Sequence, residues 1–225
     1  MAHRTLCGTI EYISDGVGVE GSESFRILCF PDGTRMLRAH SEMFNDNLVR
    51  ETLLTVNEAW QPQTAQMHLM LDDRYVGAGQ YTFSSGEVHL HRHTARGGSQ
   101  DHREPIQTPA FGGHAVQNDA WLFAASDRQR ENDAETLLEN VVISSRLPNG
   151  ADGPALLLSN QRHVFVGNED VDTKAGRFET RHYEFRFDGK PPIHYWINGE
   201  DYVLVRARWD LLRQTYDLVS LTRDE

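Results

Sequence analysis

Residues 74–94 read RYVGAGQYTFSSGEVHLHRHT, two extended runs separated by a glycine-containing turn. The turn sequence SSGE between alternating runs is typical of a β-hairpin. A turn of either two or four residues places Phe83 opposite Val88 and Tyr81 opposite Leu90, and directly opposed residues point to the same side of a sheet. The stretch therefore predicts an antiparallel hairpin with one apolar face.

Similar runs occur along most of the chain. They include SESFRILCF (22–30), LVRETLLTV (48–56), TAQMHLMLD (64–72), RFETRHYEFRF (177–187), PPIHYWI (191–197) and YVLVRARWD (202–210). Strands about every 8 to 12 residues, joined by hairpin turns, indicate an antiparallel sheet or barrel. Glycines that precede aromatic-bearing runs favour strong bending of such a sheet, because backbone without a Cβ atom bends at low cost.

The pattern changes between residues 117 and 143. NDAWLFAASDRQ (118–129) and DAETLLENVV (133–142) have apolar residues at helical spacing, and the first has an acidic start. We interpret 117–143 as a helical lid of one or two helices over an opening of the sheet. The prediction is therefore one domain, residues 1–225, that is mainly antiparallel β with a short helical insertion (α+β). Its sheet is strongly curved or forms an incomplete β-barrel lidded by one or two helices.

The composition excludes several classes of function. The chain has 22 Lys and Arg residues against 33 Asp and Glu residues, a formal net charge of −11, and its basic residues form no stripe. Such a chain repels phosphate backbones, so we expect no nucleic-acid binding. Its apolar runs are too short for membrane insertion. The start MAHRTLCG has no apolar signal-peptide core, which predicts a cytoplasmic protein, or a periplasmic one if a signal peptide has been removed.

Three histidines, His89, His91 and His93, alternate along the second run of the opening hairpin and share one face of it. The register above places them opposite Thr82, Gln80 and Ala78, on the polar side. We favour a solvated sheet face for these imidazoles. Two other interpretations stay open. The histidines line the wall of a polar ligand pocket, or they form a metal site with a distant further ligand. We predict no metal.

A second predicted hairpin, RHYEFRFDGKPPIHYWI (181–197), also alternates aromatic residues with His, Glu and Arg. A three-residue loop DGK places Glu184 opposite His194 and Tyr183 opposite Tyr195. A Glu–His pair is a proton-transfer couple in a pocket and a weak charge pair on a surface, and we favour the surface. The pair Arg206 and Arg208 shares one strand face that a carboxylate-bearing ligand could use.

The segment Val171–Tyr183, V-x-T-x-A-G-x-F-x-T-x-H-Y, followed by Trp196-Ile197 and a final Y-x-L, resembles the closing strands of the LolA/LolB-like superfamily. The helix start Asp119-Ala120-Trp121-Leu122 fits the same layout. The resemblance implies an incomplete antiparallel barrel lidded by helices, with an apolar cavity for acyl chains or other lipophilic ligands. The many His and Arg residues on the strands depart from that pattern.

We expect a small-molecule-binding protein that holds a lipophilic or aromatic ligand in the cavity of a half-barrel, without a cofactor. The predicted ligand-binding residues are Tyr81, Phe83, Trp121, Tyr183, Tyr195, Trp196, Arg206 and Arg208. The alternative is a cofactor-free lyase, isomerase or hydratase that uses His/Glu acid–base chemistry, with His89, His91, His182, Glu184 and His194 as catalytic candidates. A purely structural or interaction domain is the third hypothesis. Whether the protein is an enzyme, and its oligomeric state, stay open at this point.

Overall fold

The computed structural model describes residues 3–130 and 135–224. Fifteen strands form one sheet in the order β8-β7-β6-β5-β4-β3-β2-β1-β15-β14-β13-β12-β11-β10-β9. The strands are β1 (Arg4–Ser14), β2 (Gly18–Cys29), β3 (Arg35–Met43), β4 (Leu48–Val56), β5 (Pro62–Leu71), β6 (Arg74–Ser84), β7 (Glu87–Thr94), β8 (Gly98–Glu104), β9 (Phe111–Gly112), β10 (Glu135–Ile143), β11 (Leu157–Thr173), β12 (Gly176–Phe187), β13 (Lys190–Asn198), β14 (Val203–Trp209) and β15 (Gln214–Asp224).

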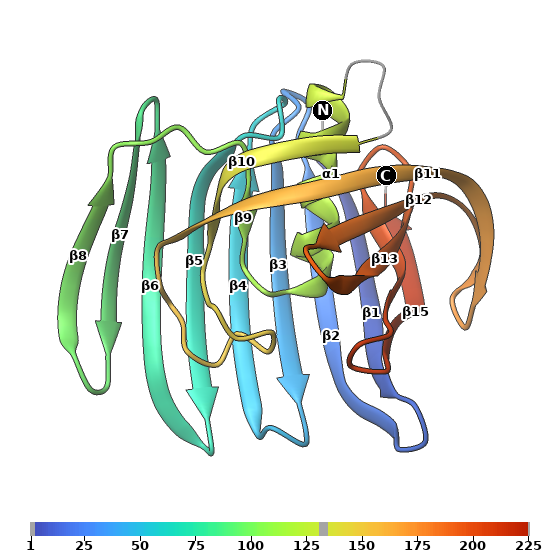
Figure 1. Ribbon diagram of the computed structural model, residues 1–225, viewed down its shortest axis with the longest axis horizontal. Helices are drawn as coiled ribbons and strands as arrows, with labels where there is room; N and C mark the ends of the chain where they lie inside the picture. The colour runs from blue at the N-terminus through green and yellow to red at the C-terminus, as the bar shows by residue number, and fades with distance from the viewer. Residues whose placement is uncertain (1–2, 131–134, 225) are drawn as a thin grey trace.

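The two ends of the chain meet in the middle of this sheet. β1 pairs with β15 over residues Thr5–Ser14, and successive hairpins extend outward from both strands. Among the described strands, only β9 and β10 pair in parallel. The outermost strands, β8 and β9, do not pair with each other, so the described sheet curls without closing, as Figure 1 shows. A mainly antiparallel, strongly curved, open sheet with a short helical insertion is thus confirmed.

The helix α1 (Val116–Gln129) lies inside the curl. In Figure 1 it stands between the long strands β10 and β11 and the strands of the first half of the chain. Ten of its fourteen residues are buried, among them Trp121, Phe123 and the polar residues Gln117 and Asn118. A lid would keep a solvated outer face, whereas this helix is enclosed on nearly all sides. The helix and its packed neighbours occupy the space in which we expected a ligand.

The prediction of a second helix is wrong. Residues 135–143 form the strand β10, which pairs with β11, and residues 131–134 lie outside the described part of the chain. The register shifts between Leu138 and Val141, where Asn140 has a φ of 60°. This β-bulge turns both Leu138 and Val141 inward, and both are fully buried. The resulting spacing of apolar residues imitates that of a helix.

The inner face of the sheet follows the predicted alternation. Phe83 lies opposite Val88 and Tyr81 opposite Leu90, as predicted, across a two-residue turn in which Gly86 has a φ of 93°. Alternate side chains from both halves of the chain converge on α1 to form the main core cluster. No helix in residues 3–130 and 135–224 combines the length and apolarity that crossing a membrane requires.

Candidate functional site

The three alternating histidines point to the outside of the curled sheet. His91 and His93 are exposed, and His89 is half-buried. The Asp101 carboxylate, on the neighbouring strand β8, lies 2.8 Å from His89 Nε2 and 3.2 Å from His91 Nδ1. These hydrogen bonds lower the pKa of the Asp101 carboxyl group. Across the described residues, no group of three or more His, Cys, Asp or Glu side chains is placed to hold a metal ion.

A groove of about 460 Å³ crosses this outer face over β4 to β7. Its lining includes the small residue Ala78 and the backbone of Gly79, whose missing side chain would point the other way, toward Pro154. The longer residues around them are Glu51, Leu53, Gln66, Met67, His68, Gln80, His91 and His93. The groove is open along the sheet surface, and most of its polar side chains are solvated.

A second polar cluster lies on the outer face of β12 and β13. The predicted register is confirmed, with Glu184 opposite His194 and Tyr183 opposite Tyr195. His182 Nε2 lies 3.0 Å from His194 Nδ1, and the His182 ring stacks on Trp196 with 4.5 Å between centroids. Burial and the adjacent His194 lower the pKa of His182. Three of the five catalytic candidates therefore gather here, although 3.9 Å separates the Glu184 carboxylate from His194 Nδ1.

Most predicted ligand-binding aromatic residues are part of the packed core. Tyr81, Trp121, Tyr183 and Tyr195 are each at most 5% exposed. Tyr81 donates its hydroxyl proton to the carbonyl of Ala155 at 2.7 Å. Tyr183 and Tyr195 pack around Phe123 of α1, at centroid distances of 4.8 and 4.9 Å.

The remaining predicted ligand-binding residues divide between the two faces. Phe83 packs against the core, 5.7 Å from the ring of Phe111. Trp196 is on the outer face, where its indole N–H donates to Glu169. Arg206 and Arg208 share that outer face, as predicted. Their partners are carboxylates of this chain: Asp217 for Arg206, and Asp15 and Asp210 for Arg208.

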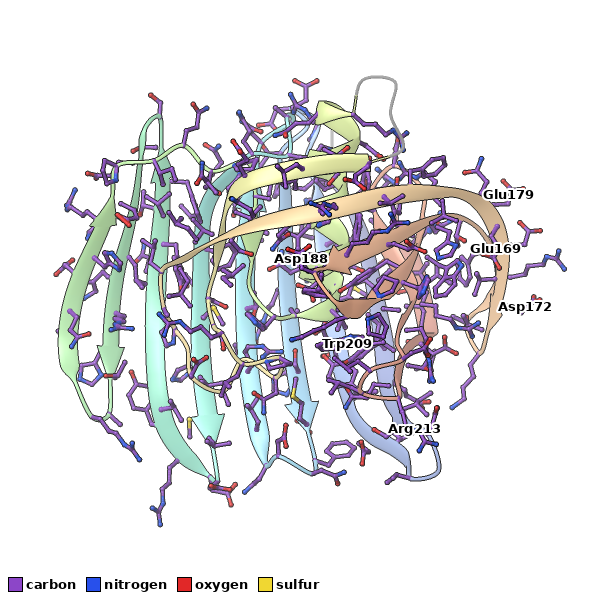
Figure 2. All side chains as sticks on the ribbon, in the orientation of Figure 1. Glu169, Asp172, Glu179, Asp188, Trp209 and Arg213 are labelled. Atoms are coloured by element: carbon purple, nitrogen blue, oxygen red, sulfur yellow. The ribbon has the colours of Figure 1, made fainter. Side chains whose placement is uncertain are left out.

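A partly enclosed pocket lies at the end of the curl where several turns meet. It has a volume of about 330 Å³, within the range of small-molecule sites. We call it the mouth pocket. It is lined by Tyr12, Glu20, Met43, Asn45, Asp46, Leu147, Pro148, Asn149, Leu212, Gln214 and Tyr216. Figure 2 marks this end of the molecule by Arg213, whose carbonyl accepts from the amide N–H of Asp15 in the β1–β2 turn.

Exposed apolar side chains surround this end. Ten large apolar residues of the described chain are exposed, and six of them belong to the turns and strand ends near the mouth pocket: Val17, Val19, Phe44, Leu147, Leu211 and Leu212. Backbone hydrogen bonds hold these segments together, such as that from Phe44 N to Glu20 O at 2.7 Å. Clustered apolar side chains with polar neighbours are characteristic of binding sites.

Two tyrosines form one side of the pocket wall. Tyr12 and Tyr216 pack edge to face, with centroids 4.9 Å apart and ring planes at 80°. The Tyr12 hydroxyl donates to Glu23 at 2.8 Å, and the Tyr216 hydroxyl donates to Gln214 Oε1 at 2.9 Å. Burial, followed by the charges of nearby carboxylates, raises the pKa of both phenols, so both stay neutral.

The wall is rigid because Glu23 anchors the helix behind it. Glu23 is fully buried and accepts four hydrogen bonds, from the hydroxyls of Tyr12 and Ser41 and from the backbone N–H groups of Val116 and Gln117. The residue before the helix, Ala115, offers no side-chain cap. The carboxylate from β2 therefore takes the place of an N-cap and faces the positive end of the helix dipole.

Arg50 fixes the loop that forms the opposite wall. Its fully buried guanidinium donates from Nη1 to the carbonyl of Asn149 at 2.7 Å and from Nη2 to the carbonyl of His114. Gly150 has a φ of +77°, and a Cβ atom there would lie 2.3 Å from Arg50 Nη1. The loop can close over the arginine only with glycine at this position.

Asp119, in the first turn of α1, is a further acid behind the pocket. A small part of its side chain reaches water, but protein atoms surround the carboxyl group densely. Burial, followed by the charge of Glu23, raises its pKa to about 7, with Arg50 opposing both effects. Within the described residues, no hydrogen bond to its carboxylate is formed. Its charge reaches Tyr216 and raises the pKa of that phenol.

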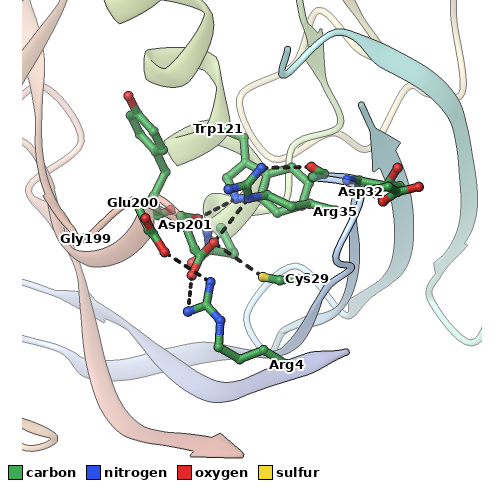
Figure 3. Close-up of polar contacts among 12 residues, drawn as sticks. Arg4, Cys29, Asp32, Arg35, Trp121, Gly199, Glu200 and Asp201 are labelled. Atoms are coloured by element: carbon green, nitrogen blue, oxygen red, sulfur yellow. Dashed lines mark hydrogen bonds and ion pairs between the residues drawn. The ribbon is translucent and has the colours of Figure 1, made fainter. Parts of the chain in front are cut away.

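The opposite end of the molecule is closed by an ion-pair cluster, shown in Figure 3. Asp201, 5% exposed at its side chain, lies 2.8 Å from Arg4 Nη1 and 3.1 Å from Arg35 Nε. The indole N–H of Trp121 donates to the Asp201 carbonyl, and Arg35 stacks over Trp60 at 4.3 Å. These contacts join the β13–β14 turn to β1, β3 and the helix, so we assign the cluster to stability.

Our sequence analysis missed Glu23 and Arg50, although the strand pattern of the sequence marks both. Glu23 has the same strand parity as the buried Phe25 and Ile27, and Arg50 the same as Leu48 and Leu54. A charge on an otherwise apolar strand face is costly unless it is paired, and it therefore indicates a specific interior role. Tyr12 and Tyr216 have no such signal, because inward tyrosines are ordinary core residues.

Comparisons with known proteins support the fold. No family model and no curated protein matches this sequence. A "beta-barrel-like protein of domain of unknown function DUF1849" from Brucella abortus is similar over the whole of both chains, with a TM-score of 0.59 and 9% identity. A DUF1089 family protein from Pseudomonas aeruginosa matches 81% of this chain and 87% of its own, with a TM-score of 0.47 and 8% identity. The first likeness shows a shared β-barrel-like fold, and the second is too distant to add to it.

Proposed function

We propose that this protein binds a small lipophilic or aromatic molecule in the mouth pocket. The observation that carries the proposal is a partly enclosed pocket of about 330 Å³, lined by two edge-to-face tyrosines and bordered by exposed apolar side chains. Pockets of this kind, mostly apolar with a few fixed polar groups, are typical of ligand sites. The LolA/LolB-like resemblance of the closing strands is consistent with a ligand-binding role.

The proposed site differs from the half-barrel cavity that the sequence suggested. Since α1 fills the centre of the curl, the ligand enters at the end, where Leu147 and Leu212 belong both to the lining and to the exposed rim. Burying such side chains against an apolar ligand is favourable by about 25 cal/mol per Å² of apolar surface. Glu23 and Arg50 hold the walls in place beforehand, which reduces the entropic cost of binding.

The experiment uses the neutral fluorescent probe N-phenyl-1-naphthylamine. We expect saturable binding to the full chain with increased probe fluorescence. Leu147→Trp, which adds an indole at the rim, should weaken binding at least about tenfold by occupying the pocket. Leu158→Trp is the matched control, because Leu158 is comparably exposed, at 42% against 46%, and does not line the pocket. Equal binding by both variants and wild type would refute the assignment.

The enzymatic alternative is the second proposal, and the outer cluster of His182, His194 and Glu184 is the observation that favours it. The two imidazoles are in hydrogen-bond contact, and His182 has a lowered pKa, so it is neutral and able to accept a proton near pH 7. Its test is turnover of a candidate substrate by His182→Ala and His194→Ala, with His89→Ala and His91→Ala alongside. Unchanged turnover in all four variants removes this alternative.

A further inference from the structure

We propose that the ligand of the mouth pocket is a cation: an amine or quaternary ammonium group attached to an apolar or aromatic body. This inference rests on the proposed function and specifies the chemical class of its ligand. It is carried by the charges that line the pocket and by the orientation of the tyrosine hydroxyls.

The charged side chains that line the pocket are carboxylates. Glu20 and Asp46 both belong to the lining, and its eleven residues include no Lys or Arg. Glu20 accepts from the neutral donors Ser14 and Asn45, and Asp46 accepts from Asn149. Neither carboxylate forms an ion pair with a described residue. Their negative charge is thus oriented and uncompensated, in contrast to Asp15 at the same end, which pairs with Arg208.

A group behind the lining adds to this negative potential. Glu23 is a buried carboxylate in direct contact with the Tyr12 hydroxyl. The nearest buried cation, Arg50, directs both terminal nitrogens to backbone carbonyls. It offsets part of this charge but presents no donor to a ligand anion. An anionic ligand would therefore meet repulsion with no cation in the lining to compensate it, since Arg208 and Arg213 at the same end pair with Asp15.

The two tyrosines suit an ammonium group. The Tyr216 hydroxyl donates its proton to Gln214, so its oxygen keeps lone pairs that can accept a hydrogen bond from a ligand N–H, whereas the Tyr12 hydroxyl is bound to the buried Glu23. Both rings line the pocket with their planes at 80°, and a cation over the face of such a ring is attracted by the aromatic quadrupole. Together with Glu20 and Asp46, the pair combines cation–π and carboxylate recognition around an apolar wall.

The test compares three amphiphiles with the same tail, each below its micelle concentration: decyltrimethylammonium, decyl glucoside and decyl sulfate. Isothermal titration calorimetry on the full chain should give the tightest binding for the ammonium and the weakest for the sulfate. The double variant Glu20→Gln/Asp46→Asn should weaken ammonium binding about tenfold, since each carboxylate contributes about threefold in a half-solvated site. Binding of the neutral glucoside should stay within about twofold.

The matched control is Asp72→Asn/Asp73→Asn. It removes two charges from the neighbouring β5–β6 turn, where both residues are exposed and have the positive φ that asparagine tolerates. It should leave ammonium binding within about twofold. If glucoside or sulfate binds as tightly as the ammonium, or the Glu20/Asp46 variant binds the ammonium unchanged, the cation inference is wrong while ligand binding stands. If none of the three probes binds, both proposals are wrong.

Discussion

Glu23 provides the sharpest test of how the interior is held together. Its carboxylate accepts four hydrogen bonds of 2.8 to 2.9 Å, two of them from backbone N–H groups in the first turn of α1. In Glu23→Ala the two hydroxyls can rotate toward other acceptors, whereas the two buried N–H groups have no replacement partner at a helix start without a side-chain cap. An unsatisfied buried donor costs about 1 to 3 kcal/mol, and the lost interaction with the helix dipole adds about 1 kcal/mol. The expected loss in the free energy of unfolding is about 4 kcal/mol.

Urea denaturation followed by circular dichroism measures this loss from the shift in midpoint at an unchanged m-value. Glu23→Gln keeps the shape and one acceptor oxygen, so it should cost about 2 kcal/mol and preserve enough folded protein for comparison. Glu87→Gln is the control; its carboxylate forms an exposed ion pair with Arg103 that contributes at most about 1 kcal/mol. A loss below about 1 kcal/mol for Glu23→Ala would contradict the role assigned to this carboxylate.

Three further predictions concern stability. Folding raises the pKa of Asp119 from 3.8 to about 7. Between these two pH values the native chain keeps a proton that the unfolded chain has lost. The carboxyl group therefore lowers the free energy of unfolding progressively as the pH rises from 4 to 7. Asp119→Asn should gain less than about 1 kcal/mol at pH 4 and about 3 kcal/mol at pH 8, and a pH-independent gain in chemical denaturation would contradict this. Burial lowers the pKa of His163 from 6.5 to about 3. The unfolded chain therefore takes up a proton at a higher pH than the native chain, and the stability of the wild type falls below pH 6.5. His163→Phe should reduce the loss of unfolding free energy between pH 7 and pH 5 by about 2 kcal/mol. Asp201→Asn leaves two arginines without their buried partner and should cost about 3 kcal/mol in thermal unfolding, against less than about 0.5 kcal/mol for the exposed Glu200→Gln.

The strands were predictable because alternation is a local property of the sequence. The pairings of Tyr81 with Leu90 and of Glu184 with His194 follow from turn position and parity alone. The error at residues 135–143 has a local cause as well, because a bulge at Asn140 breaks the parity on which strand prediction depends. The spacing of apolar residues identified the helix α1. It gave no information on whether this helix covers the opening of the curled sheet or fills its interior.

The candidate site was not predictable in the same way. The mouth pocket combines strands and turns that are distant in the sequence, such as Tyr12 with Tyr216, and Asp46 with Asn149. These residues meet only because β1 pairs with β15 and because Arg50 holds the 147–150 loop against the sheet. The aromatic residues that sequence reasoning selected for binding, Tyr81, Trp121, Tyr183 and Tyr195, instead pack in the core.

The most direct test of ligand binding in the mouth pocket is to locate the bound ligand. With decyltrimethylammonium added to isotope-labelled protein, nuclear Overhauser contacts should connect the ligand methyl groups to the rings of Tyr12 and Tyr216 and its tail to the side chains of Leu147 and Leu212. Contacts to His68, His91 and His93 in the outer groove, with none to the two tyrosines, would contradict it.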